Sequence, residues 1–158
     1  MTRTLLFLLA AMLAAPVTAA KPLFADKAPL SVSIEAPFDR MFRDRDSEEP
    51  AAGTFTDPAG NRLAVTVELR GITRRSADTC AFPPLAIRFS APPPATSLFA
   101  GQKKLKIVTH CRTSASFDRI LLLEYAAYRL YQSMTPRSFG TRLATIRYVD
   151  PSGRVVAT

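Results

Sequence analysis

The sequence predicts an α+β protein in which a mostly antiparallel sheet packs on one long helix. Short segments in which apolar and polar residues alternate recur along the chain, as expected for half-buried strands. Clusters of Gly, Pro, Asn and Asp separate these segments and mark turns. Helical periodicity is sustained in only one long segment, residues 117–134. The predicted order is five strands, one helix and two strands, which is typical of an α+β domain.

The first 20 residues have the pattern of a secretory signal peptide. Arg3 precedes the apolar run from Leu5 to Ala15, and small residues suited to cleavage follow up to Ala20. A run of ~11 residues is too short to span a bilayer, which needs ~20. The sequence therefore predicts Sec export to the periplasm or the medium, and no stable membrane anchor.

The remaining chain divides into an N-terminal extension with the first strands, residues 21–62, and an α+β domain, residues 63–158. Leu63 to Leu69 alternates most clearly, and the turn signal at residues 57–61 joins it to the preceding strand as a hairpin. Three consecutive prolines at 92–94 place that segment in an outer connection. The strands are expected at residues 30–34, 53–56, 63–69, 85–89, 105–109, 142–149 and 154–157. Because the last strand is very short, we expect the domain to be incomplete at its C-terminus.

The long helix is expected from about Phe117 to Met134. Ser116 is a good N-cap, and Pro136 prevents the helix from continuing. One arc of the helix is apolar and is expected to pack on the sheet, together with the tyrosines of the same segment. Glu124 lies at the edge of this arc, and a buried carboxylate requires a cationic partner. The arc contains Ile120, Leu123, Ala127, Leu130, Tyr131 and Met134.

The two cysteines, Cys80 and Cys111, are expected to form a disulfide. An exported chain folds in an oxidising compartment, and each cysteine lies near the end of a predicted strand. Two free thiols are a less favoured alternative. A metal site formed with His110 is also less favoured, because adjacent His and Cys are poorly placed as ligands and a fourth ligand is missing. His110 is otherwise expected to be structural.

Positive charge is concentrated toward the C-terminus. Residues 101–158 carry ten Lys and Arg and three Asp and Glu. Such a segment could bind nucleic acid, anionic lipid or a phosphorylated ligand, but a solvated, arginine-rich surface is the favoured interpretation. The arginines alternate along strands and no aromatic RNA-binding motif is present, so we expect neither DNA nor RNA as a partner.

Several short motifs occur in order between residues 63 and 153. They are Arg70-Gly71, the Pro-led strand ending Ile87-Arg88-Phe89, Leu98-Phe99-Ala100-Gly101, Leu105-Lys106-Ile107 and the helical segment Leu122–Leu130. Their order resembles the N-terminal lobe of CotH-like secreted kinase-like proteins, or of a related exported family. The chain departs from that pattern at Ile72-Thr73-Arg74 and Pro83-Pro84, where the family has N-S-S and paired lysines, and at Ser152-Gly153, where the family has N-G.

The resemblance implies a kinase N-lobe-like fold in which a strand cation binds phosphate and pairs with a helix glutamate. Glu124 is the expected glutamate, and Lys106 or Arg88 the expected cation. A structural ion pair, or a glutamate at the edge of the buried face, is the alternative. Arg70 and Arg74 are candidates for phosphate contacts, against the alternative of a solvated turn.

The resemblance also implies a kinase-like phosphotransferase lobe that is inactive alone. No catalytic residue and no metal ligand is expected in the chain. ATP and Mg²⁺ would bind only together with a second lobe beyond residue 158, so nucleotide is the implied ligand, and a protein partner is unknown. The alternative is a non-catalytic periplasmic or secreted binding or structural module.

Overall fold

The computed structural model describes residues 22–158, so the expected signal peptide lies outside the described residues. Two α-helices, α1 (Phe38–Arg43) and α2 (Ala115–Met134), and two short 3₁₀ turns, η1 (Pro22–Phe24) and η2 (Thr73–Arg75), accompany a single sheet. The seven strands are β1 (Leu30–Glu35), β2 (Ala51–Thr56), β3 (Arg62–Leu69), β4 (Leu85–Phe89), β5 (Lys104–Ile107), β6 (Ala144–Val149) and β7 (Val155–Ala157).

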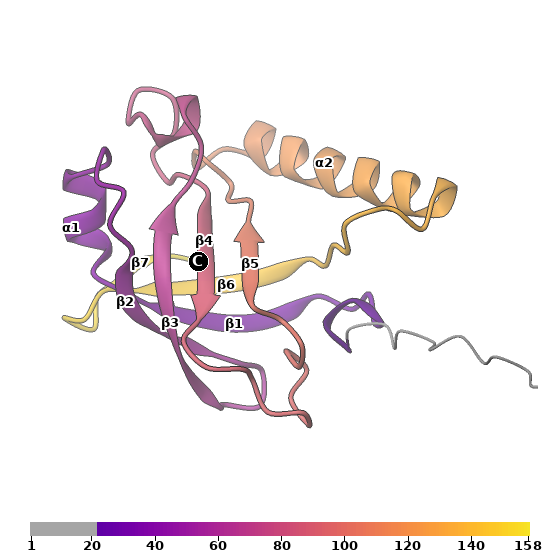
Figure 1. Cartoon of the computed structure of the whole chain (residues 1–158). Coiled ribbons are helices and arrows are strands. Elements are labelled where there is room, and N and C mark those ends of the chain that lie inside the picture. Colours follow the sequence, from indigo (N-terminus) through magenta and orange to yellow (C-terminus); the bar gives the residue numbers. More distant parts are fainter. Residues whose placement is uncertain (1–21) are drawn as a thin grey trace, which may run out of the picture.

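The sheet has the order β5-β4-β3-β2-β1-β6-β7. Every neighbouring pair is antiparallel except β1 and β6, which are parallel. The predicted α+β class with a mostly antiparallel sheet is therefore confirmed. Residues 21–62 and 63–158 contribute strands to this same sheet. The sheet curls strongly, so that β3, β4 and β5 run steeply across β1 and β6 (Figure 1).

The alternation of apolar and polar residues along the sequence explains why the central strands form where they do. In β3, Val65 and Val67 are buried while Ala64 is exposed, which is the period of two expected for a half-buried strand. Leu85 and Ile87 of β4 continue the same buried face, since Val67 and Ile87 are paired across the two strands.

The short helix α1 packs against the hydrophobic core of the sheet. The sequence indicated only an exposed loop or a short helix at residues 40–49. The helix begins earlier, at Phe38, and buries Phe38 and Met41. Around Phe38 lie the aromatic rings of Phe42, Phe82 and Tyr148, with ring centroids 5.7 to 6.1 Å away. Burial raises the pKa of the Tyr148 phenol.

The long helix α2 is present, but it supplies no buried residue to this core. The expectation that its apolar arc packs on the sheet is wrong. Leu123, Leu130 and Met134 of that arc are exposed, whereas the opposite side, including Phe117 and Leu121, is partly buried. Figure 1 shows α2 lying along one edge of the molecule, with no other described element on its outer side.

Asp150, in the turn between β6 and β7, links this end of the sheet to α1. Its carboxylate accepts a hydrogen bond from the Asp39 backbone N–H at 3.1 Å and one from the Ser152 N–H at 3.3 Å. The Asp39 bond is the main reason that the pKa of Asp150 lies below its ordinary value of 3.8, and Arg154 lowers it further.

Stability should therefore depend on the ionisation of Asp150. A depressed folded-state pKa means that the stabilisation is complete above 3.8 and is lost as the pH falls through the folded-state value. Asp150→Asn should be less stable than wild type at neutral pH, and the difference should shrink below pH 3.8. Urea unfolding at a series of pH values measures it. A difference that stays constant into acid would contradict the role of the charge.

Candidate functional site

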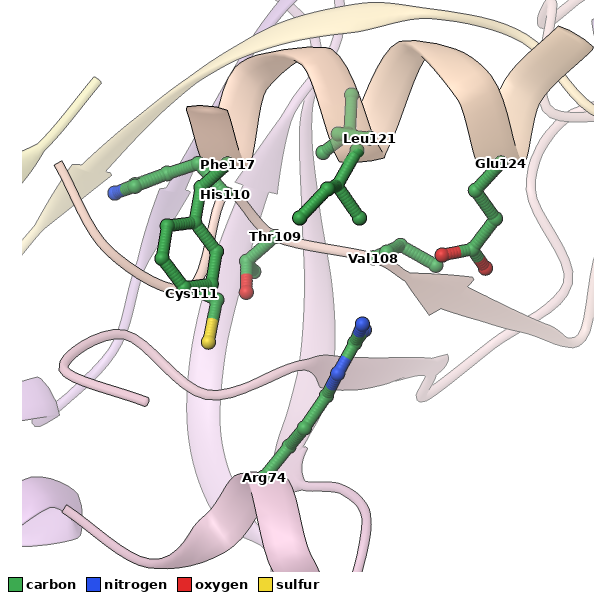
Figure 2. A pocket seen from close by; sticks show the side chains of 9 residues that line it. Arg74, Val108, Thr109, His110, Cys111, Phe117, Leu121 and Glu124 are labelled. Atoms are coloured by element: carbon green, nitrogen blue, oxygen red, sulfur yellow. The ribbon is translucent and has the colours of Figure 1, made fainter. Parts of the chain in front are cut away.

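Three segments that are distant in sequence enclose a small hollow beside α2. Arg74 comes from η2, Thr109 and His110 from the segment after β5, and Leu121 and Glu124 from α2 (Figure 2). The cavity volume is only about 10 Å³, and the hollow is partly open to solvent. Its complete lining is Arg74, Val108, Thr109, His110, Cys111, Phe117, Ile120, Leu121 and Glu124.

The Cys80–Cys111 disulfide, confirmed by the structure, brings the first two segments together. Its Cα atoms are 4.7 Å apart, and it joins positions separated by 31 residues. Next to it, Phe82 donates its backbone N–H to the Cys111 carbonyl at 2.9 Å, and the Thr109 hydroxyl donates to the Phe82 carbonyl at 2.7 Å. Cys111 has a φ of 63°, which turns the chain sharply before α2 begins.

Two arginines donate hydrogen bonds to backbone carbonyls around Cys80. Arg45 donates to the carbonyls of Cys80 and Ala81, both at 2.7 Å. Arg112 donates to the Thr79 carbonyl at 3.0 Å. Sequence reasoning placed Arg45 in a charged, exposed stretch, because no local signal shows that its guanidinium reaches a loop 35 residues away. Partial burial lowers the pKa of Arg45 without removing its charge.

Glu124 lies in the hollow rather than beside the strand cations. Figure 2 shows its carboxylate and the Arg74 guanidinium extending into the hollow from opposite sides. Within residues 22–158, no Lys or Arg lies close enough to Glu124 to form a salt bridge. The structure therefore brings together two of the five candidate site residues, Arg74 and Glu124.

The other three candidates lie elsewhere. Lys106 is exposed on the edge strand β5, and its ammonium lies over the Phe139 ring, 5.8 Å from the centroid. Arg88 is exposed on β4 and pairs in register with Lys104, which itself forms a salt bridge with Glu68. The backbone N–H of Arg70 donates to the Pro84 carbonyl at 2.7 Å, which fixes the start of the basic loop, residues 71–79, that contains Arg74.

The residues present do not by themselves form a site for ATP and Mg²⁺. The hollow is smaller than the ~300–1,000 Å³ of typical ligand pockets. No group of three or more His, Cys, Asp or Glu in the described part of the chain could hold a metal ion. A second hollow, with a cavity volume of about 110 Å³, lies between α1 and the end of β3 and has a polar lining that includes Arg40, Asp44 and Glu49.

None of the described helices is both long and apolar enough to cross a membrane. Comparison of the chain with protein families, with curated proteins and with solved structures found no match.

Proposed function

We propose that this chain is an exported binding module without catalytic activity of its own, and that it binds its partner through α2. The observation that carries this proposal is a 20-residue helix with no buried residue and a largely apolar outer side. We call this outer side the α2 face. It consists of Leu122, Leu123, Ala126, Ala127, Leu130, Tyr131 and Met134.

Large apolar side chains of α2 are unusually exposed to solvent. Leu123, Leu130 and Met134 are 69%, 65% and 73% exposed. A helix that is apolar on nearly all sides is normally buried, and large exposed apolar patches mark interaction sites. Complete burial of one such side chain stabilises by ~1.5–3 kcal/mol, so covering the α2 face would release several kcal/mol.

The disulfide supports the proposal of export. Structural disulfides form and persist in oxidising compartments, and Cys80 and Cys111 are both buried. Neither the hollow beside Glu124 nor the exposed Lys106 and Arg88 supplies the enclosed, convergent polar groups that catalysis needs. Binding through a surface requires none of these.

Photo-crosslinking in the exporting cell tests the proposal. A photoreactive amino acid at Leu130 should form adducts with the bound partner, whether lipid or protein. The same amino acid at Ala52, which is exposed on β2, serves as the matched control and should form few. Equal adduct yields at the two positions, or none at Leu130, would show that the α2 face is not the binding surface.

A second candidate function is the N-terminal lobe of a kinase-like phosphotransferase, inactive alone. The common orientation of Glu124 and Arg74 toward one hollow supports it, because a phosphate-binding cation and a helix glutamate are what such a lobe supplies. The α2 face would then receive the catalytic lobe.

The coding sequence downstream of Thr158 separates the two candidates, because ATP and Mg²⁺ are expected to bind only together with a second lobe. A downstream segment with a catalytic-loop Asp and Asn and a metal-binding Asp would favour the phosphotransferase lobe, and a stop codon without such a segment would contradict it. In the two-lobe protein, Glu124→Gln and Arg74→Gln should both weaken the binding of a fluorescent ATP analogue with Mg²⁺, while Arg154→Gln should not.

A further inference from the structure

The α2 face is nearly free of charge, and this restricts what can cover it. At ~100° per residue, the residues of the α2 face span an arc of about 180°. Arg119 is the only charged side chain within this arc. The two acidic residues of the helix lie outside it, Asp118 near the helix start and Glu124 in the hollow.

Positive charge predominates in the part of the sequence that contains α2. Residues 103–147 carry nine Lys and Arg but only two Asp and Glu. Two copies joined through this face would bring two such segments together, and like charges in proximity oppose association. An anionic surface would instead be attracted to the segment.

Two further exposed apolar side chains belong to the segment that follows α2 and to the loop that supplies Arg74 to the hollow. Phe139 follows the helix, is 72% exposed and carries the Lys106 ammonium over its ring. Ile72 is 96% exposed and begins the short turn that places Arg74 opposite Glu124. An apolar side chain next to a cation suits the boundary between acyl chains and phosphate headgroups, because the apolar part enters and the charge stays at the phosphates.

We propose that the α2 face docks on the surface of an anionic phospholipid bilayer, with α2 parallel to the membrane plane. This inference rests on the proposed function and names its partner. The helix is about 30 Å long and lies at the edge of the molecule, so it can contact a flat surface along its length. Leu123, Leu130 and Met134 enter the acyl boundary, and Arg119 and Lys106 contact headgroup phosphates.

Sedimentation with vesicles tests this proposal directly. The processed, exported protein is mixed with vesicles of phosphatidylcholine, with or without phosphatidylglycerol, at low and high salt. Wild type should bind the anionic vesicles, bind the neutral vesicles much less, and lose binding as salt increases, because screening weakens attraction to the surface.

Variants locate the binding surface. Leu123→Ser combined with Leu130→Ser should lower the partition coefficient at least about tenfold, because two apolar side chains no longer enter the bilayer. Val155→Ser, on the strand at the opposite edge of the sheet from β5, is the matched control and should bind like wild type. Arg119→Gln should weaken binding at low salt only. Equal thermal midpoints for all variants establish that each is folded, and Leu130→Ser alone provides a milder form of the same test.

Three results would overturn the lipid proposal: no sedimentation of wild type with anionic vesicles, sedimentation that the double variant leaves unchanged, or a wild-type dimer that the double variant dissociates. If vesicles fail while crosslinking at Leu130 yields protein adducts, the binding-module proposal stands and the lipid proposal fails. If crosslinking at Leu130 also yields nothing, both fail.

Discussion

Replacing Phe38 with alanine should lower the free energy of unfolding by about 3–5 kcal/mol. Phe38 is completely buried, and its ring lies 5.7 Å from Tyr148 in an edge-on arrangement and 5.8 Å from Phe42. The substitution removes this aromatic packing and leaves a cavity where α1 meets the hydrophobic core of the sheet, which a close-packed core fills only in part. Urea unfolding followed by far-ultraviolet circular dichroism measures the decrease.

Phe139→Ala is the matched control for this prediction. It deletes the same atoms from a side chain that is 72% exposed, and its main effect is to remove the ring beneath the Lys106 ammonium. The expected change is within about 1 kcal/mol. If the two variants were equally stable, Phe38 would not be the centre of the core.

The strands could be predicted because their signal is local. Alternation in Leu63 to Leu69 gives the buried face of β3 directly, and the turn at residues 57–61 gives its antiparallel partner. The parallel pairing of β1 with β6 could not be predicted in this way. It joins Leu30 to Ala144, and no local pattern specifies a register between segments so distant in sequence.

For helix α2, the periodicity of apolar residues predicts the helix but not which of its sides is buried. The pattern correctly gave one long helix and one apolar arc. The opposite side also carries large side chains, including Phe117, Leu121 and Tyr128, and these are the partly buried ones. Hydrophobicity alone therefore allowed either side of α2 to pack against the rest of the protein. The path of the chain between β5 and α2 determines which side does so.

Arg74 was not predicted to lie opposite Glu124, because this arrangement also depends on the three-dimensional path of the chain. Lys106 or Arg88 was expected because the family resemblance implies a strand cation beside the helix glutamate, but the Lys106 side chain lies at Phe139 instead. Arg74 reaches the hollow because the disulfide ties its loop to the segment that starts α2. Both cysteines were visible in the sequence, whereas the position of the basic loop relative to the helix depends on their pairing in three dimensions.

Replacing both cysteines with alanine should lower the free energy of unfolding by about 2–5 kcal/mol. The loop that the disulfide closes spans 31 residues, and in the chain-entropy model its closure contributes about 4 kcal/mol by restricting the unfolded chain. The variant should still fold, because the backbone bond from Phe82 to Cys111 and the hydroxyl bond from Thr109 to Phe82 do not require sulfur.

Reductant provides the control. Dithiothreitol should destabilise the wild type by a similar amount and leave the Cys80→Ala/Cys111→Ala variant unchanged. Because α2 begins at Ala115, soon after Cys111, amide exchange should accelerate more at residues 108–114 than in β2 and β3. Uniform acceleration, or none, would mean that the disulfide does not position α2. In that case the orientation of the α2 face would depend on the arginine contacts to the loop carbonyls instead.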